Sequence, residues 1–161
     1  LEAEGFLRSR VSGKNRLFSL NLDDAPTLAH FLAALEHLRT LRFFRTNPLI
    51  KQVAAKLLPA CTGTVLIFGS HVKGTATKDS DLDLFVIGSC DRAVATRLSD
   101  TYRLPLSIKA YPPTAFARAL ARNDILVNEV RKHHIILTGA HEFASSVLRS
   151  ARVHEPSNPS A

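Results

Sequence analysis

The chain has 161 residues, of which 45% are hydrophobic, so it can bury one core of its own. No apolar run approaches the roughly 20 residues that span a bilayer, so the sequence excludes a membrane-spanning helix and predicts no membrane partner. The formal net charge of +7 favours polyanionic partners, either nucleotides or nucleic acid.

The two cysteines, Cys61 and Cys90, are far apart in the sequence and lack the spacing of metal ligands. We interpret each as a small buried side chain or a free thiol rather than as half of a disulfide, which predicts a cytoplasmic protein. The chain contains no methionine and begins at Leu1, so we expect it to be a fragment of a longer protein.

The first 20 residues predict a basic β-hairpin. Residues 6–20 alternate between apolar and polar side chains around a turn at residues 12–15. Residues 1–4 would be the end of a helix that Gly5 caps. This order resembles the wing of a winged helix-turn-helix domain, and four basic side chains would then contact DNA phosphates: Arg8, Arg10, Lys14 and Arg16. The alternative is an ordinary basic hairpin packed on the domain.

Two helices follow the hairpin. Asp23 or Asp24 would cap the first, which runs to about Phe44 with leucines recurring on one face. Asn47 would cap the second, with Pro48 at its first position, and residues 59–63 end it.

No acidic residue lies between Glu36 and Asp79. The basic residues of this tract are Arg39, Arg42, Arg45, Lys51, Lys56, Lys73 and Lys78. Each of them fits a solvated helix face, and together they also fit an electrostatic funnel that leads into a phosphate site.

The most specific feature is a strand–turn–strand motif in residues 65–87. An apolar run ends in Gly69-Ser70, and ten residues later Asp81 and Asp83 open a second apolar run. Positions i and i+2 of a strand share a face, so the two carboxylates project together while the leucine between them enters the core.

These residue types suit a nucleotide bound together with a metal ion. Two hard oxygen ligands suit Mg²⁺, which combines carboxylates with substrate phosphates. Gly69 permits close approach of the backbone, and Ser70 offers a hydroxyl and an N–H group to a phosphate. The motif therefore predicts a magnesium–nucleoside triphosphate site.

The remaining residues alternate helices and strands. Asp91 precedes a helix, residues 104–110 alternate as a third strand, and residues 112–113 begin another helix. Asp124 would cap the next helix, a short strand occupies residues 135–137, and a last helix follows Gly139. The predicted fold class is α/β (α+β), with a small mixed sheet flanked by helices and an N-terminal hairpin plus helix.

The motif resembles the nucleotidyltransferase superfamily related to DNA polymerase β, and within it the minimal nucleotidyltransferases. That family has a Gly-Ser turn, a basic residue before a glycine and an Asp-x-Asp about ten residues after the turn. The resemblance implies ATP as substrate, one or two Mg²⁺ ions held by Asp81 and Asp83, and a catalytic set of Ser70 with these two aspartates. The nucleotide-binding residues would be Gly69, Ser70, Lys73 and Gly74.

One position departs from the family. The resemblance implies a third carboxylate on the next strand, which shares a metal ion and takes the proton of the acceptor. The matching position holds Ser107, with Lys109 beside it, and serine replaces a carboxylate neither as metal ligand nor as base. This departure predicts a slow or catalytically degenerate transferase.

Two hypotheses follow for the function. The size and motif resemble the minimal nucleotidyltransferase antitoxins, which implies transfer of AMP from ATP to a hydroxyl of a partner HEPN-domain toxin. The alternative is a catalytically degenerate nucleotidyltransferase fold that acts as a DNA-binding or partner-binding regulator.

These predictions divide the chain into three parts. Residues 1–44 would form the wing-like hairpin and linking helix, and residues 45–150 the minimal nucleotidyltransferase domain. We predict that residues 151–161 form a disordered tail, because proline and serine replace the apolar pattern there.

Overall fold

The computed structural model describes residues 1–153. In chain order the strands are β1 (Leu7–Ser12), β2 (Asn15–Leu20), β3 (Cys61–Phe68), β4 (Leu82–Cys90), β5 (Leu106–Tyr111) and β6 (Ile135–Thr138). The helices are α1 (Ala25–Thr46), α2 (Pro48–Leu57), the 3₁₀ turn η1 (Leu58–Ala60), α3 (Ser70–Lys73), α4 (Arg92–Tyr102), α5 (Pro113–Ala121), α6 (Ile125–Lys132) and α7 (Ala140–Val153).

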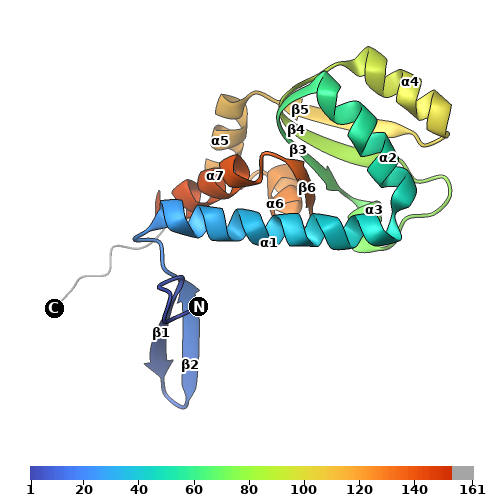
Figure 1. Ribbon diagram of the computed structural model, residues 1–161. Coiled ribbons are helices and arrows are strands. Elements are labelled where there is room, and N and C mark those ends of the chain that lie inside the picture. The colour runs from blue at the N-terminus through green and yellow to red at the C-terminus, as the bar shows by residue number, and fades with distance from the viewer. Residues whose placement is uncertain (154–161) are drawn as a thin grey trace.

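A four-stranded mixed sheet forms the centre of the molecule, which confirms the predicted fold class (Figure 1). Its strand order is β5-β4-β3-β6, with β3 antiparallel to both of its neighbours and β4 parallel to β5. Alternate side chains of β3 and β4 enter two separate cores, as a period of two requires. Helices α2 and α4 cover one face, while α1, α5, α6 and α7 lie on the other.

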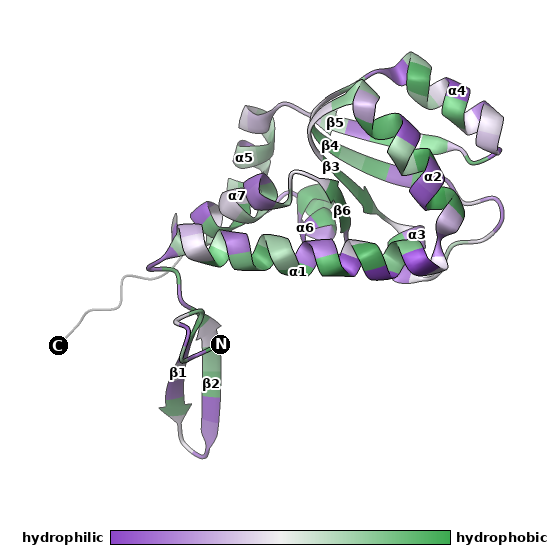
Figure 2. Ribbon diagram, viewed as in Figure 1, coloured by the Kyte–Doolittle hydropathy of each residue, from purple (hydrophilic) through white to green (hydrophobic). Residues whose placement is uncertain are grey.

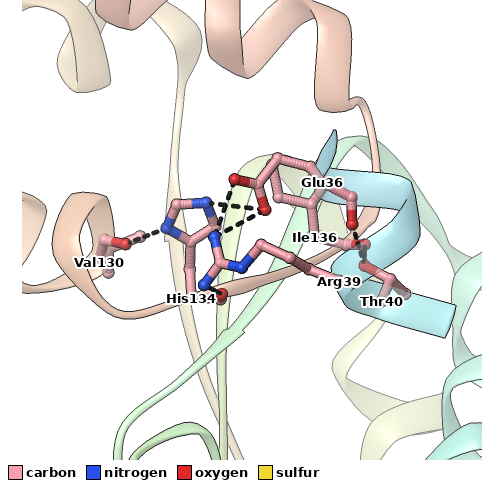
Figure 3. Close-up of polar contacts among 6 residues, drawn as sticks. All are labelled: Glu36, Arg39, Thr40, Val130, His134 and Ile136. Atoms are coloured by element: carbon pink, nitrogen blue, oxygen red, sulfur yellow. Dashed lines mark hydrogen bonds and ion pairs between the residues drawn. The ribbon is translucent and has the colours of Figure 1, made fainter. Parts of the chain in front are cut away.

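Helix α1 covers the edge of β6 that faces away from β3, where residues 1–153 supply no further strand (Figure 3). Arg39 donates from Nη2 to the carbonyl of His134 at 3.0 Å, and the Thr40 hydroxyl donates to the carbonyl of Ile136 at 2.7 Å. These two carbonyls are two residues apart in the chain, so they point outward on the same edge. Side chains of α1 thus take the place of a neighbouring strand.

A buried histidine, His134, adds to the contacts between α1 and the residues next to β6. His134 directs Nδ1 at the carbonyl of Val130, 2.7 Å away, and Nε2 at a carboxylate oxygen of Glu36, 3.6 Å away. Both partners of the ring are therefore acceptors. Burial raises the pKa of Glu36, but His134 and Arg39 outweigh it, and the pKa of Glu36 lies below its ordinary value.

The hairpin β1–β2 stands away from the body of the protein beyond the N-terminal end of α1 (Figure 1). Nearly all of its side chains are exposed, so it does not pack on the domain. The predicted helix end at residues 1–4 is wrong, because these residues form a turn in which the Gly5 N–H donates to the carbonyl of Glu2 at 3.0 Å.

The cysteine prediction is also wrong. Cys61 and Cys90 are cross-strand partners at one end of the β3–β4 pair, with their Cα atoms 4.0 Å apart, and they form a disulfide. Strand β3 begins four residues before the apolar run that predicted it, and this extension brings the two cysteines into register. The expectation of a cytoplasmic protein rested on free thiols and loses that basis.

Other boundaries differ only slightly from the prediction. Asp24, rather than Asp23, caps α1 by accepting a hydrogen bond from the Thr27 N–H, and Asp124 caps α6 in the same way. Helix α7 extends to Val153, so residues 151–153 are helical, and the rest of the predicted tail lies outside the described residues. Across residues 1–153, none of the helices has the length and apolarity that crossing a membrane demands.

Candidate nucleotide and metal site

The Gly-Ser turn and the Asp-x-Asp lie against each other at one end of the sheet. Strand β3 ends at Phe68, which is the cross-strand partner of Asp83 in β4. The next residue, Gly69, has φ +75° and leads into the single turn of α3, which begins at Ser70. A Cβ atom at Gly69 would collide with the Asp83 carboxylate, so this carboxylate lies directly against the backbone of the turn.

The two aspartates face away from the apolar core beneath them. Leu82 and Leu84 are each only 1% exposed, as the strand alternation predicted, whereas Asp83 is partly exposed and Asp81 is exposed. Within residues 1–153 neither carboxylate has an ion-pair or hydrogen-bond partner. Their charges are therefore uncompensated by the protein.

This donor set fits Mg²⁺. The described residues contain no group of three or more His, Cys, Asp or Glu side chains that would enclose a metal ion. Mg²⁺ does not need one, because it usually binds one or two carboxylates together with substrate phosphates and water. Asp81 and Asp83 are the residues that would hold it.

The register of β5 places Ser107 directly beside Asp83. The two residues are partners in the parallel β4–β5 ladder, and Lys109 is the partner of Phe85 two positions further on. The position that would bring a third carboxylate next to Asp83 therefore carries a hydroxyl. The nearby acids Asp79, Asp91 and Asp100 all lie outside β5.

A carboxylate that the sequence did not indicate reaches the predicted phosphate loop, residues 69–74, from α6. Oε1 of Glu129 lies 2.5 Å from Nζ of Lys73, the predicted phosphate-binding cation. The contact with the Lys73 ammonium, which outweighs burial, lowers the pKa of Glu129. The sequence alone did not indicate Glu129 as a site residue, because only the pairing of β6 with β3 brings the C-terminal end of α6 beside the loop that holds Lys73.

The loop from α3 to β4 is held by local hydrogen bonds. The Thr75 N–H donates to the carbonyl of Ser70 at 3.0 Å, and the Thr77 N–H donates to the Ser80 hydroxyl at 2.8 Å. His71 lies with Nε2 3.4 Å from the carbonyl of Ser80, just before the first aspartate. Gly74, in the left-handed region with φ +71°, ends α3.

The predicted nucleic-acid residues lie far from this loop. The hairpin projects at the N-terminal end of α1, whereas α3 lies near its C-terminal end (Figure 1). Arg8 forms an ion pair with Asp23, and Arg16 forms one with Glu2 at 2.8 Å. Across residues 1–153, Arg10 and Lys14 have no ion-pair partner.

Comparisons with known proteins identify a family for residues 49–149. A family model described as a nucleotidyltransferase domain matches residues 49–149. No curated protein matches the chain. Among solved structures, one described as "Crystal structure of the toxin-antitoxin with AMP-PNP" matches at 15% sequence identity and a TM-score of 0.44, over 67% of this chain and 86% of that chain. Since the family model spans more than half of the sequence, the chain belongs to the nucleotidyltransferase domain family.

Proposed function

We propose that the protein transfers a nucleoside monophosphate, AMP from ATP, to a hydroxyl acceptor in a Mg²⁺-dependent reaction. The observation that carries the proposal is the placement of the Asp83 carboxylate against the Gly69 backbone, with Asp81 two residues before it. A triphosphate seated on the turn would bring its phosphate oxygens next to the metal-binding carboxylates.

Each residue of the site has one role in this proposal. Backbone N–H groups at Gly69 and Ser70, with the Ser70 hydroxyl, bind the β- and γ-phosphates. Lys73 compensates phosphate charge, and Gly74 lets the chain leave the phosphate loop. Asp81 and Asp83 would hold Mg²⁺, and the bound ion would supply charge compensation for the triphosphate. Catalysis of this kind depends on positioning and electrostatics.

Acceptor activation is the weaker half of the site. Ser107 next to Asp83 cannot take a proton from the acceptor as a carboxylate would. We therefore expect slow transfer, unless the acceptor arrives with its own base. A partner protein that carries a base beside its acceptor hydroxyl meets that condition, and the resemblance of the motif to antitoxin nucleotidyltransferases favours a HEPN-domain toxin.

A second candidate function rests on two observations. The hydroxyl at Ser107 and the projecting hairpin, with its unpaired Arg10 and Lys14, fit a degenerate nucleotidyltransferase that binds DNA as a regulator. The variant Ser107→Asp separates the two: transfer by the natural protein favours the enzyme, whereas transfer only by the variant favours the degenerate form.

Calorimetric titration with ATP, with and without Mg²⁺, tests the proposal directly. We expect metal-dependent binding that the double variant Asp81→Ala/Asp83→Ala loses. Asp100→Ala removes an exposed acid from α4 and should bind as the natural protein does. Binding that ignores the metal or survives the double variant would refute the site, and incubation with labelled ATP and candidate acceptor proteins then tests transfer.

A further inference from the structure

Helix α1 has apolar side chains on two opposite faces. Its inner face contributes Leu28, Ala29 and Ala33 to the cores beneath it. Its outer face carries three exposed leucines in consecutive turns, with exposed fractions of 40% for Leu35, 52% for Leu38 and 61% for Leu41. Figure 2 accordingly shows hydrophobic bands along the whole length of α1. A surface helix with a polar outer face would carry charged residues at these positions.

The exposed leucines form one continuous surface. Residues three and four apart lie on the same side of a helix, so Leu35, Leu38 and Leu41 form a stripe together with the exposed Ala34. Arg42 and Arg45 extend the same face toward the C-terminal end of α1, and both are exposed. We call these six residues the outer face of α1. Contiguous apolar surface of this kind commonly marks an interaction site.

The charge of the outer face determines what it can bind. Glu36 is the one acid in the sequence of α1, and it points toward the body, where it contacts Arg39 and His134 (Figure 3). Arg42 and Arg45 therefore meet no acid on their own helix. A partner helix with apolar residues at i, i+3, i+4 and i+7 and acidic residues beside them would cover the leucines and pair both arginines.

We propose that the outer face of α1 binds an acidic amphipathic helix of another protein. A second copy of this chain fits less well. In an antiparallel pair of α1 helices centred on Leu38, Arg42 would face Ala34 and Arg45 would face Phe31 of the other copy. Four arginines would then lack partners in the interface, and two chains of net charge +7 would repel each other. The proposal holds whether or not the nucleotide site turns over.

A designed peptide tests the surface without a guess at the natural partner. The probe is a helix-forming peptide with leucines at i, i+3, i+4 and i+7 flanked by glutamates. Its control is the same peptide with lysines in place of the glutamates. We expect the acidic peptide to bind at least about tenfold more tightly by fluorescence anisotropy, and to shift the amide NMR signals of α1.

Two pairs of substitutions locate the binding. Leu38→Ser/Leu41→Ser should weaken binding of the acidic peptide about tenfold or more, whereas Ile125→Ser, at a residue 89% exposed on α6, should leave it unchanged. Arg42→Gln/Arg45→Gln should abolish the preference for the acidic peptide, whereas Arg92→Gln/Arg97→Gln on α4 should retain it. All these side chains are exposed, so thermal unfolding should confirm an intact fold.

Three results would overturn the inference. They are no binding of the acidic peptide, equal binding of both peptides, and a dimer in analytical ultracentrifugation that Leu38→Ser/Leu41→Ser dissociates. The last result would assign the outer face of α1 to a second copy of the chain.

Discussion

A single residue, Gly69, shapes the proposed phosphate loop. Gly69 combines φ +75° with a Cβ direction that points into the Asp83 carboxylate. We expect Gly69→Ala to lose Mg-ATP binding in calorimetry, because the new methyl group displaces either the turn or the metal-binding carboxylate. Gly5→Ala is the matched control, since Gly5 has φ +77° and open space around its Cβ direction. It should cost about 1–2 kcal/mol of backbone strain at most and leave nucleotide binding intact.

The Lys73–Glu129 pair makes a second prediction at the residue scale. The Glu129 carboxylate forms an ion pair with the Lys73 ammonium, which a bound phosphate would otherwise contact. Glu129→Gln should therefore tighten ATP binding by a few fold, measured by the same titration, because the amide carries no charge to compete with the phosphate. Glu142→Gln, an exposed acid of α7, should leave the affinity unchanged. Weaker binding by Glu129→Gln would mean instead that the carboxylate positions Lys73 for the phosphate.

At the scale of elements, the sequence predicted what local patterns specify and missed what distant contacts add. Alternation in residues 82–87 and the caps at Asp24 and Asp124 follow from neighbouring residues, and the structure confirms them. The disulfide and the Glu129 contact depend on strand register and on the β6–β3 pairing. Neither the disulfide nor the Glu129 contact can be predicted from one segment, because each joins residues that are distant in the sequence. Ser107 was placed correctly because the residues that follow it set the strand register.

The contacts that Glu36 makes with Arg39 and His134, where α1 covers the edge of β6, predict that the free energy of unfolding depends on pH. The pKa of Glu36 is lowered in the folded state, so its contribution to stability is present above its unfolded pKa of about 4.3 and is lost as the pH falls through the folded pKa. At pH 7 we expect Glu36→Gln to cost about 2 kcal/mol, or about 4–8 °C in Tm, because Arg39 and His134 lose their partner.

The difference in Tm between the natural protein and Glu36→Gln should shrink toward zero as the pH falls through the folded-state pKa of Glu36, because the carboxyl is then protonated in both the folded and the unfolded chain. Thermal unfolding followed by circular dichroism at several pH values measures it. Glu142→Gln serves as the control for loss of an exposed carboxylate. A Tm difference that does not change with pH would show that the Glu36 charge does not stabilise the contact between α1 and β6.

At the scale of the whole molecule, the proposed nucleotide site and the basic hairpin lie at opposite ends of α1, so their ligands should bind independently (Figure 1). If the hairpin binds duplex DNA, Arg10→Gln/Lys14→Gln should lower the slope of log affinity against log salt by about 2, since each phosphate contact contributes about 0.9. Arg8→Gln/Arg16→Gln removes the same charge but should change the slope less. Arg8 already pairs with Asp23, and Arg16 pairs with Glu2 and lies 5.5 Å from the centre of the Phe18 ring. Equal slopes for both variants would mean that the hairpin makes no specific phosphate contacts, and the proposed DNA-binding role would then fail while ATP binding remained.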